Sequence, residues 1–392
     1  MIKLNKNKLL KFNQDKIKNK NILLRVDFNI NFINKKIFDK YRILSAKKTI
    51  DSLKQARQII LISHFQNGIS LKKIIPSFEK LLKIKIGFLE DLKSKPKEKF
   101  NFLENIRNFK GEENCDLNFA KKLSSLGEIF IFEAFSVSHR KHASVYLLPK
   151  ILETYYGFNF EKEINLLNKV LKNLNKCVLV LSGAKISTKL PLVYKFVKKS
   201  KCVVLAGGLA NTFLKAKGFE LGKSLYEEKM LKELKNLKSP KILVPFDFLI
   251  LESNEKINFF NKSKPKIIIK SKSLGEIGLK DFIVDIGQES LKILFEELKK
   301  EKYIIWNGPL GFIENKPFQK GTLEFAKFLL KLKNKFILVG GGDTLSFLEQ
   351  KRLISKFKNV STGGGAMLHY LATETFPAFE KNLIYKNEKF CS

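Results

Sequence analysis

Short apolar segments alternate with amphipathic ones along the chain. The apolar segments are NILLRV (21–26), QIILIS (58–63), EIFIF (128–132), CVLVL (177–181), CVVLA (202–206), KILVP (241–245), YIIW (303–306) and FILV (336–339). Their apolar residues are consecutive, as in strands that are buried on both faces of a parallel sheet. The stretches between them, such as 70–83 and 320–333, are amphipathic with a helical period. The pattern therefore predicts an α/β fold.

The same alternation occurs on both sides of the segment YYGFNFEKEINLLNKVLKNLNK, at about 155–176, which we interpret as one helix. A chain of 392 residues exceeds what one hydrophobic core usually serves, so two domains are expected. We therefore predict two doubly wound halves joined by this helix. Ligands of such sheets bind beyond the carboxyl ends of the strands, so the residues that follow each apolar segment are the candidates for a site.

The charge of the chain is its most unusual bulk property. Lys and Arg number 74 against 38 Asp and Glu, a formal net charge of +36, which raises nucleic acid or an anionic surface as a partner. The lysines are spread along the whole chain, however, without a basic block interleaved with aromatic residues. We interpret the charge as compositional bias and expect no nucleic-acid partner. Only six basic residues are Arg, at 25, 42, 57, 107, 140 and 352, and a retained Arg suggests a need for its planar donor group.

Two other classes of protein are disfavoured. No apolar segment approaches the roughly 18 residues of a membrane span, and the first residues, MIKLNKNKLLKFNQDK, lack the apolar block of a signal peptide. The cysteines, at 115, 177, 202 and 391, have neither disulfide-framework nor zinc-ligand spacing. We therefore expect a soluble, cytoplasmic protein with reduced thiols and no membrane partner.

In the first half, arginines and histidines follow the apolar segments. They lie in RVDFN (25–29), DKYRILSA (39–46), SHFQNG (63–68), ENIRNF (104–109) and EAFSVSHRKHAS (133–144). Singly, each is more typical of a surface ion pair or an ordinary loop residue. Together they suit the binding of a phosphorylated carboxylate. A metal site is disfavoured here, because HRKH has no acidic or cysteine partner nearby and the arginines would repel a cation.

In the second half, glycines and lysines follow the apolar segments. The strand ends are SGAKISTK (182–189), AGGLANTF (206–213), VPFDF (244–248), WNGPLGFIE (306–314), VGGGDT (339–344) and STGGGA (361–366). Main-chain N–H groups at helix starts bind phosphate without a side chain, although a single glycine run is more often a tight turn. Lys185 and Lys189 would share a face if their turn continues into a helix. Neither GxxxxGK[ST] nor a GxGxxG after the first strand is present, so P-loop and dinucleotide sites are disfavoured.

Nearly end to end, the chain resembles the phosphoglycerate kinase family. The motifs that carry the resemblance are RVDFN, ENIR, HRKHAS, GAK, KGFELGKS, WNGPLG, PFQKGT, GGGDT and STGGGA, in the order of the family. The resemblance implies reversible transfer of the acyl phosphate of 1,3-bisphosphoglycerate to ADP with Mg²⁺, giving 3-phosphoglycerate and ATP, in a monomer with two Rossmann-like domains. It implies a substrate domain at 1–155, a hinge helix at 156–176, a nucleotide domain at 177–371, and a tail from about 372 to 392 that packs on the first domain.

The resemblance also implies roles for particular residues. The glycerate and its 3-phosphate would contact Asp27, Phe28, Asn29, Arg42, His64, Asn67, Arg107 and Arg140. The nucleotide would contact Gly183, Lys189, Gly207, Asn307, Pro309, Glu314, Gly341, Gly342, Asp343 and Thr344, with Asp343 at the magnesium ion and Glu314 at the ribose. The catalytic set would be Arg42, Lys185, Gly363, Gly364 and Gly365.

The chain departs from the family pattern at several positions. Asn67 stands where an arginine is usual, Ser182 where GGAK has glycine, Glu133 in place of the Asp of NDAF, and His369 where an acidic residue is common. We expect weaker substrate binding and retained chemistry. Two alternatives stay open: a catalytically silent relative that acts as a binding or scaffold protein, and a nucleic-acid binder with steeply salt-dependent affinity.

Overall fold

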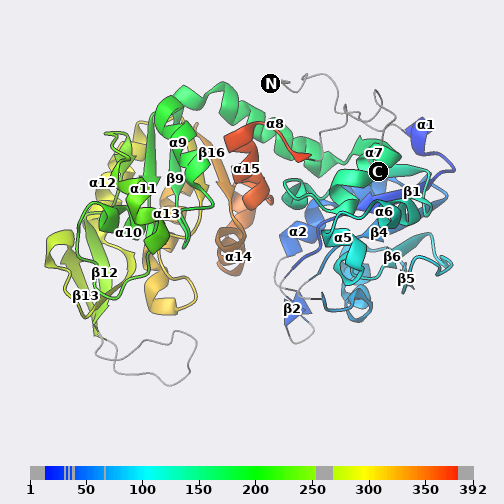
Figure 1. The fold of residues 1–392 in the computed structure, drawn as a ribbon, viewed down its shortest axis with the longest axis horizontal. Helices are drawn as coiled ribbons and strands as arrows, with labels where there is room; N and C mark the ends of the chain where they lie inside the picture. Colours follow the sequence, from blue (N-terminus) through cyan, green and yellow to red (C-terminus); the bar gives the residue numbers. More distant parts are fainter. Residues whose placement is uncertain are drawn as a thin grey trace. The chain divides into compact units, whose positions relative to one another are not determined.

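The computed structural model describes residues 14–30, 32–33, 36–37, 40–65, 68–252 and 268–377. The chain divides into two compact units: one extends to Leu167 and resumes at Gly365, and the other is Asn168–Gly364 (Figure 1). Each unit contains a six-stranded parallel sheet with helices between its strands. The predicted α/β fold with two doubly wound sheets is confirmed, and all eight apolar segments named above contain strands.

The sheet of the first unit has the order β5-β6-β4-β1-β7-β8. Its strands are β1 (Asn21–Arg25), β4 (Gln58–Ile62), β5 (Ile86–Leu89), β6 (Phe100–Leu103), β7 (Ile129–Phe132) and β8 (Glu153–Tyr156), and a separate hairpin pairs β2 (Phe32–Ile33) with β3 (Lys36–Ile37). Its helices are α1 (Gln14–Ile17), α2 (Lys40–Ser45), α3 (Lys47–Ser52), α4 (Ile75–Leu82), α5 (Lys110–Glu113), α6 (Leu117–Ser124), α7 (Leu148–Ile151) and α15 (Gly365–Thr373).

The sheet of the second unit has the order β11-β10-β9-β15-β16-β17, which is the dinucleotide-fold order 3-2-1-4-5-6. Its strands are β9 (Cys177–Leu181), β10 (Cys202–Leu205), β11 (Ile242–Leu243), β15 (Tyr303–Asn307), β16 (Phe336–Gly340) and β17 (Asn359–Ser361). Its helices are α9 (Leu190–Lys199), α10 (Gly207–Ala216), α11 (Leu231–Lys235), α12 (Gln288–Lys299), α13 (Lys320–Lys331) and α14 (Gly342–Gln350).

A second sheet in this unit was not predicted. It is antiparallel, with the order β13-β12-β14, and comprises β12 (Asp247–Glu252), β13 (Ile268–Ser273) and β14 (Asp281–Ile286). The segment VPFDF follows β11 of the parallel sheet, as we interpreted it, and its last two residues begin β12. The apolar residues of β12 and β14 carry no local signal for antiparallel pairing, because that pairing depends on long-range contacts.

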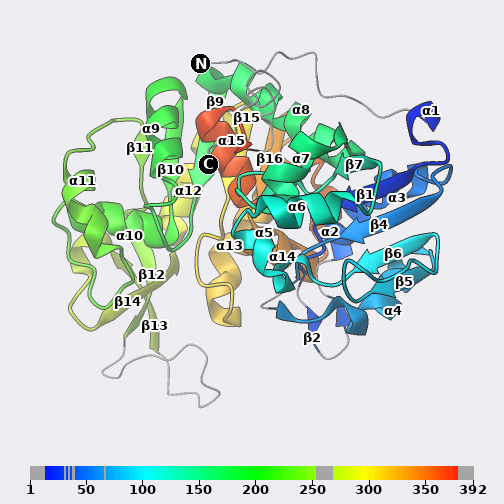
Figure 2. The same cartoon turned by 45° about the vertical axis from the view of Figure 1, so that its right-hand side comes forward.

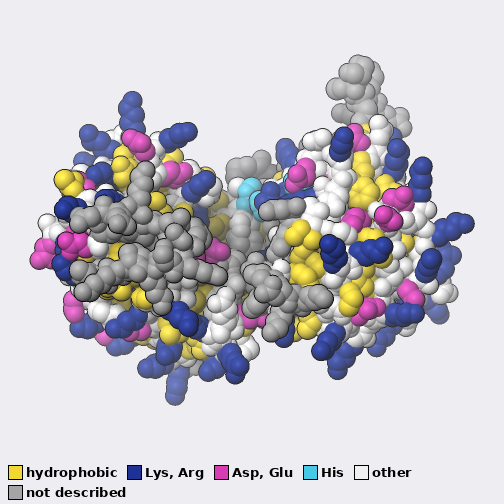
Figure 3. Space-filling model, turned by 90° about the horizontal axis from the view of Figure 1, so that it is seen from below, with side chains coloured by type: hydrophobic (Ala, Val, Ile, Leu, Met, Phe, Trp, Pro, Cys, Tyr) yellow, Lys and Arg dark blue, Asp and Glu magenta, His cyan; other side chains and the backbone are white. Residues whose placement is uncertain are grey.

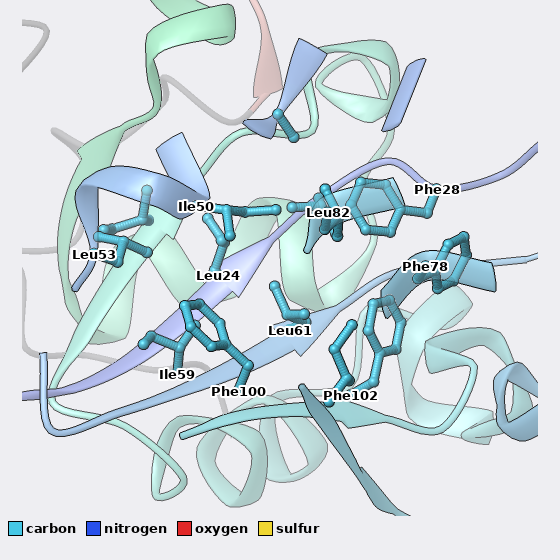
Figure 4. Close-up of a cluster of buried hydrophobic side chains, with 14 of the residues drawn as sticks. Leu24, Phe28, Ile50, Leu53, Ile59, Leu61, Phe78, Leu82, Phe100 and Phe102 are labelled. Atoms are coloured by element: carbon cyan, nitrogen blue, oxygen red, sulfur yellow. The ribbon is translucent and has the colours of Figure 1, made fainter. Parts of the chain in front are cut away.

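The core of the first unit lies between its sheet and the helices beside it. Leu24 of β1 and Leu61 of β4 point into it (Figure 4). The rings of Phe28, Phe78 and Phe102 pack together with centroid distances of 5.1, 6.0 and 5.7 Å. Because Phe28 is fully buried, it fixes the segment that directly follows β1, where candidate substrate residues lie.

The helix that we predicted at about 155–176 is α8 (Phe158–Lys172), and the first residues of the predicted range belong to β8.

The buried carboxylate of Glu133 holds the first turn of α8. Its Oε1 accepts from Asn159 N at 3.1 Å and from Thr49 Oγ1 at 2.7 Å, and its Oε2 accepts from Phe160 N at 3.0 Å. A carboxylate at this position pairs N–H groups that have no partner within the helix. The longer side chain at this departure from the family pattern therefore caps α8.

Glu133 should make stability depend on pH. Burial raises its pKa to about 7, although the bonds from Thr49, Phe160 and Asn159 oppose the shift. Because the pKa of Glu133 is raised in the folded state, the stabilisation by this group is fully present below about pH 4.5 and is lost as pH rises through about 7. The free energy of unfolding should change by an amount on the order of 3 kcal/mol over this range. Urea unfolding at pH 5 and pH 8 should show a smaller pH dependence in Glu133→Gln than in the wild type. Glu90→Gln, at an exposed site, is the control, and equal pH dependence in all three proteins would contradict this assignment.

Candidate active site

The first group of candidate residues lies where the sheet of the first unit changes its winding direction. Chain connections lead from β1 toward β4 on one side and from β7 toward β8 on the other, so β1 and β7 flank the switch point. Ligands of doubly wound sheets bind beyond the strands at such a point. Asp27 follows β1 and Glu133 follows β7. Asp27, a predicted substrate residue, thus lies at the edge that the fold makes available.

Asp27 organises this edge. Its Oδ2 accepts from Arg42 Nη1 at 3.0 Å and from the Ser136 hydroxyl, and its Oδ1 accepts from Asn29 N at 3.1 Å. Arg42 Nη1 also donates to Asn29 O at 2.9 Å. Burial raises the pKa of Asp27, but Arg42, His64 and the hydrogen bonds outweigh it, and the pKa lies below its usual value. Asp27 is therefore ionised, and it holds Arg42 in place.

His64 is a neutral imidazole in this arrangement. Burial lowers its pKa to about 3; Asp27 opposes the shift, and the charges of Arg25, Arg107 and Arg42 add to it. Its Nδ1 is buried, lies 3.9 Å from Asp27 Oδ1, and has no hydrogen-bond partner among the described residues. The structure thus brings His64 together with Asp27 and Arg42, and the imidazole is neutral there.

The remaining substrate candidates differ in their surroundings. Arg107 is half-buried, and its Nε lies 3.1 Å from Glu113 Oε1 at an angle that gives no hydrogen bond. Arg140 is exposed, and the charges of Arg107 and Arg140 both act on His142. The Phe28 side chain lies in the core, so only its main chain could contact a substrate. Asn67 lies outside the described residues.

The second group lies at the switch point of the other unit, between β9 and β15. The loops after these strands are in close contact. Ser182 Oγ donates to Pro309 O at 2.5 Å, and Gly308 N donates to Thr344 Oγ1 at 3.0 Å. Gly308 has φ +99, and a Cβ there would collide with the main chain of Ser182, so only glycine fits. The Ser182 hydroxyl, a departure from the family pattern, therefore joins two of the loops predicted to bind nucleotide.

These loops border a pocket of the second unit. Five predicted nucleotide residues line it: Gly183, Gly207, Pro309, Glu314 and Asp343. Its apolar wall contains residues that we did not predict, among them Leu225, Phe248, Ile283 and Val284. Ile283 and Val284 lie in an apolar segment, but every strand of the core has such a segment, so this feature did not mark them as pocket residues.

The two lysines of SGAKISTK do not share a helical face, which corrects the conditional prediction made above. Residues before Leu190 form turns, and α9 begins only there. Lys189 points inward and its Nζ donates to Ser182 O; burial, opposed by Asp343, lowers its pKa to about 8. Lys185, by contrast, is exposed. Lys189 therefore supports the loop, and Lys185 is the one available to a ligand.

The two glycine triplets lie close together in space. Gly341 and Gly364 have φ of +100 and +46, and a Cβ on Gly364 would lie 3.8 Å from Gly342 N. Helix α14 begins at Gly342, where Asp343 is exposed and Thr344 buried. Gly363 N donates to Ser361 Oγ at 3.2 Å, and α15 begins at Gly365. Main-chain N–H groups at the starts of two helices thus lie at the ends of β16 and β17.

Other predicted residues near these triplets have definite positions. Asn307, at the end of β15, is buried, and its Nδ2 has no hydrogen-bond partner among the described residues. His369 on α15 lies beside His139, with ring centroids 6.1 Å apart. After α15, Phe376 packs edge-on against Phe135 of the first unit at 5.5 Å. Positions 378–392 of the predicted tail lie outside the described residues.

The fold and the strand-end residues define a class of protein, the two-domain α/β proteins that carry one doubly wound parallel sheet in each domain. Residues 12–374 match the family model described as phosphoglycerate kinase. The chain belongs to the phosphoglycerate kinase family and is a phosphotransferase. The family resemblance stated from the sequence motifs is confirmed.

Relatives of this family support the assignment over almost the full length. The chain is 35% identical to the phosphoglycerate kinase of Wolbachia pipientis wMel, with 93% of this chain and 97% of that protein covered. It is 34% identical to that of Wigglesworthia glossinidia brevipalpis, with 95% and 96% covered. Among solved structures, the phosphoglycerate kinase of Coxiella burnetii has a TM-score of 0.75 at 29% identity, covering 92% of this chain and 95% of that one. The enzyme of Pyrococcus horikoshii OT3 has a TM-score of 0.76 at 27% identity, with the same shares covered.

Proposed function

We propose that this protein catalyses the reversible, Mg²⁺-dependent transfer of the acyl phosphate of 1,3-bisphosphoglycerate to ADP, giving 3-phosphoglycerate and ATP. The observation that carries the proposal is the family match over residues 12–374 in a chain that keeps polar residues at both switch points. Phosphoryl transfer requires mainly positioning and neutralisation of charge on the phosphoryl oxygens. The arginines of the first unit, and Lys185 with the N-terminus of α14 in the second, would supply the positioning and the positive charge.

The proposed substrate sites follow the two switch points. In the first unit, the glycerate and its phosphate would contact Asp27, Asn29, Arg42, His64, Arg107 and Arg140. In the second, the base and ribose would occupy the pocket beside Gly207, Pro309 and Glu314, and the phosphates would face Gly341–Thr344. Lys185 and the triplet 363–365 would stabilise the phosphoryl group during transfer.

The proposed magnesium ion fits the residues of the second unit. No group of three or more His, Cys, Asp or Glu side chains is gathered for a metal anywhere in the described part of the chain. Mg²⁺ bound to a nucleotide commonly takes one or two carboxylates together with phosphate oxygens and water. Asp343 is exposed on the first turn of α14 and lines the pocket, so it would be the protein ligand. When bound, the ion would neutralise charge on the nucleotide phosphates.

Asp343→Ala should therefore raise the Mg²⁺ concentration needed for half-maximal activity. The loss of a carboxylate ligand is expected to raise that concentration by about tenfold, equivalent to about 1.4 kcal/mol of binding free energy. A magnesium titration at saturating ADP and 1,3-bisphosphoglycerate measures it. The control is Glu349→Ala, which removes a carboxylate from the same helix as Asp343. An unchanged titration curve in Asp343→Ala would remove this residue from the metal site.

Closure of the two domains about α8 is part of the proposal, because the acyl phosphate must be kept from water during transfer. We also propose a cytoplasmic monomer that acts on small molecules, without nucleic acid or membrane as a partner. Lys and Arg are distributed over the visible surface of each unit, with Asp and Glu between them (Figure 3). In the described residues, every helix is too short or too polar to cross a bilayer. The mixture of basic and acidic side chains on the visible surface is in keeping with a compositional origin of the charge.

A coupled assay tests the proposed function directly. ATP formation is measured from 1,3-bisphosphoglycerate, ADP and Mg²⁺ with the purified full chain, and the reverse reaction from 3-phosphoglycerate and ATP. Turnover in both directions supports the proposal. Absence of turnover, together with absence of thermal stabilisation by ADP or ATP, would favour a silent relative with a binding or scaffold role. Salt-sensitive binding of a nucleic acid without turnover would favour the remaining alternative.

A further inference from the structure

The carboxylate of Glu227 holds the loop that carries Lys185. Its Oε2 accepts from Ser187 N at 2.9 Å, and its Oε1 accepts from Ser187 Oγ at 2.5 Å. The N–H of Ile186 lies near this carboxylate and helps to lower its pKa. Glu227 is forty residues away in sequence, on the connection between α10 and α11, which lie side by side in Figures 1 and 2. The loop directly after Lys185 is thus fixed from a separate segment.

Glu227 is itself fixed by the helix that lines the pocket. Its main-chain N–H donates to Thr212 Oγ1 at 3.1 Å, and that hydroxyl donates to Gly208 O at 2.7 Å. Gly208 lies against the same loop, because a Cβ there would be 3.0 Å from Ala184 Cα. The hydrogen bonds therefore run from the first turn of α10, through Glu227, to the residues directly after Lys185.

Contacts within the loop accompany the bonds from Glu227, but they leave the Lys185 side chain exposed. Ile186 is fully buried and its O accepts from Lys189 N at 2.8 Å, while Lys185 is exposed and Thr188 Oγ1 donates to Lys185 O at 3.2 Å. Burial raises the pKa of Glu227. The hydrogen bonds from Ser187, the nearby Ile186 N–H and the charge of Lys185 outweigh this effect, so the pKa lies below its usual value. Glu227 is therefore ionised at neutral pH, and its negative charge lies close enough to act on the Lys185 ammonium group.

We infer that Glu227 is a positioning residue for the phosphoryl-transfer reaction: it accepts hydrogen bonds from the Ser187 N–H and hydroxyl and so holds Lys185 in the orientation that meets the phosphoryl group. This inference rests on the proposed function of Lys185. It assigns no substrate contact to Glu227. An interaction that orients a catalytic group contributes mainly to the rate of the chemical step, because small misplacements of a reacting group are costly.

The first experiment compares three variants of the full-length protein. Glu227→Ala should lower kcat about tenfold and change the KM for ATP by less than about threefold, since the pocket that binds the nucleotide is retained. Glu227→Gln keeps one acceptor oxygen and should lose about threefold in kcat. Glu228→Ala, at the exposed neighbouring position, should match the wild type. A Glu227→Ala variant that keeps wild-type kcat would overturn the inference.

A second comparison separates positioning from a general structural effect. In the Lys185→Ala background, Glu227→Ala should cause no further fall in the single-turnover rate, because the side chain that it orients is gone. An additional tenfold loss there would show that Glu227 acts through another group, and it would overturn the inference.

A third measurement does not depend on activity. Amide hydrogen exchange in residues 184–190 should be faster in Glu227→Ala than in the wild type or in Glu228→Ala, because the Ser187 N–H loses its acceptor. Unchanged exchange would overturn the inference even if the protein had no kinase activity. Absence of turnover in the wild type would instead count against the proposed function, so the two failures are distinguishable.

Discussion

Replacing Lys185 with Ala should lower kcat by about a hundred- to a thousandfold, equivalent to about 2.7 to 4.1 kcal/mol of transition-state stabilisation. Lys185 is exposed on the loop after β9, at the switch point of the second sheet, while its neighbour Lys189 is turned inward to Ser182 O. A cation that is free to contact the migrating phosphoryl group acts mainly in the transition state, so its loss appears in kcat more than in nucleotide binding. Steady-state kinetics with ADP and 1,3-bisphosphoglycerate measure both constants.

Lys198→Ala is the matched control, because Lys198 is an exposed lysine on the following helix, α9. It should leave kcat and both KM values unchanged. The assigned role of Lys185 would be wrong if Lys185→Ala turned over at the wild-type rate. A rise in the KM for ADP with an unchanged kcat would instead make Lys185 a ground-state binding residue.

The sequence predicted the parallel sheets because their strands are continuous apolar runs, such as 177–181 and 303–306, whose burial on both faces is a local property. It did not predict the antiparallel sheet β13-β12-β14. Strand β12 is also apolar, but its partners are set by contacts that no local pattern encodes. The predicted helix at about 155–176 began too early because Tyr155 and Tyr156, which pair in β8, have no local feature that ends a helix.

The candidate site shows a similar division. The position of a residue after a strand was enough to predict that Asp27 and His64 would lie together, because parallel strands end at one edge. Arg42 lies on α2, and its place beside Asp27 was implied by the family resemblance. The direction of each side chain was not predictable. Lys189 turns inward to Ser182 O and Lys185 is exposed, and no local pattern distinguishes these two lysines. The groups that hold these residues come from distant segments without a motif: Ser136 donates to Asp27, and Glu227 accepts from the lysine loop.

Arg42→Lys should lower kcat by about ten- to a hundredfold even though the positive charge is kept, equivalent to about 1.4 to 2.7 kcal/mol. One nitrogen of Arg42, Nη1, is already used, because it donates to Asp27 Oδ2 at 3.0 Å and to Asn29 O at 2.9 Å. The planar group keeps Nη2 and Nε for two oxygens of a substrate, in a fixed geometry. A lysine has a single nitrogen, and the ionised Asp27 would draw it away from the substrate.

The control is Arg57→Lys, because Arg57 belongs to the same unit but lies exposed near Glu128, with 3.6 Å between Nη2 and Oε2. This variant should keep the wild-type kcat and KM for 3-phosphoglycerate. Measuring both arginine variants in the direction of ATP consumption separates a need for the planar donor group from a need for charge alone. If Arg42→Lys matched the wild type, charge would suffice at this position, and the bidentate role that we assign to Arg42 would be wrong. A loss confined to the KM for 3-phosphoglycerate would place Arg42 at the bound substrate instead of at the phosphoryl group in transfer.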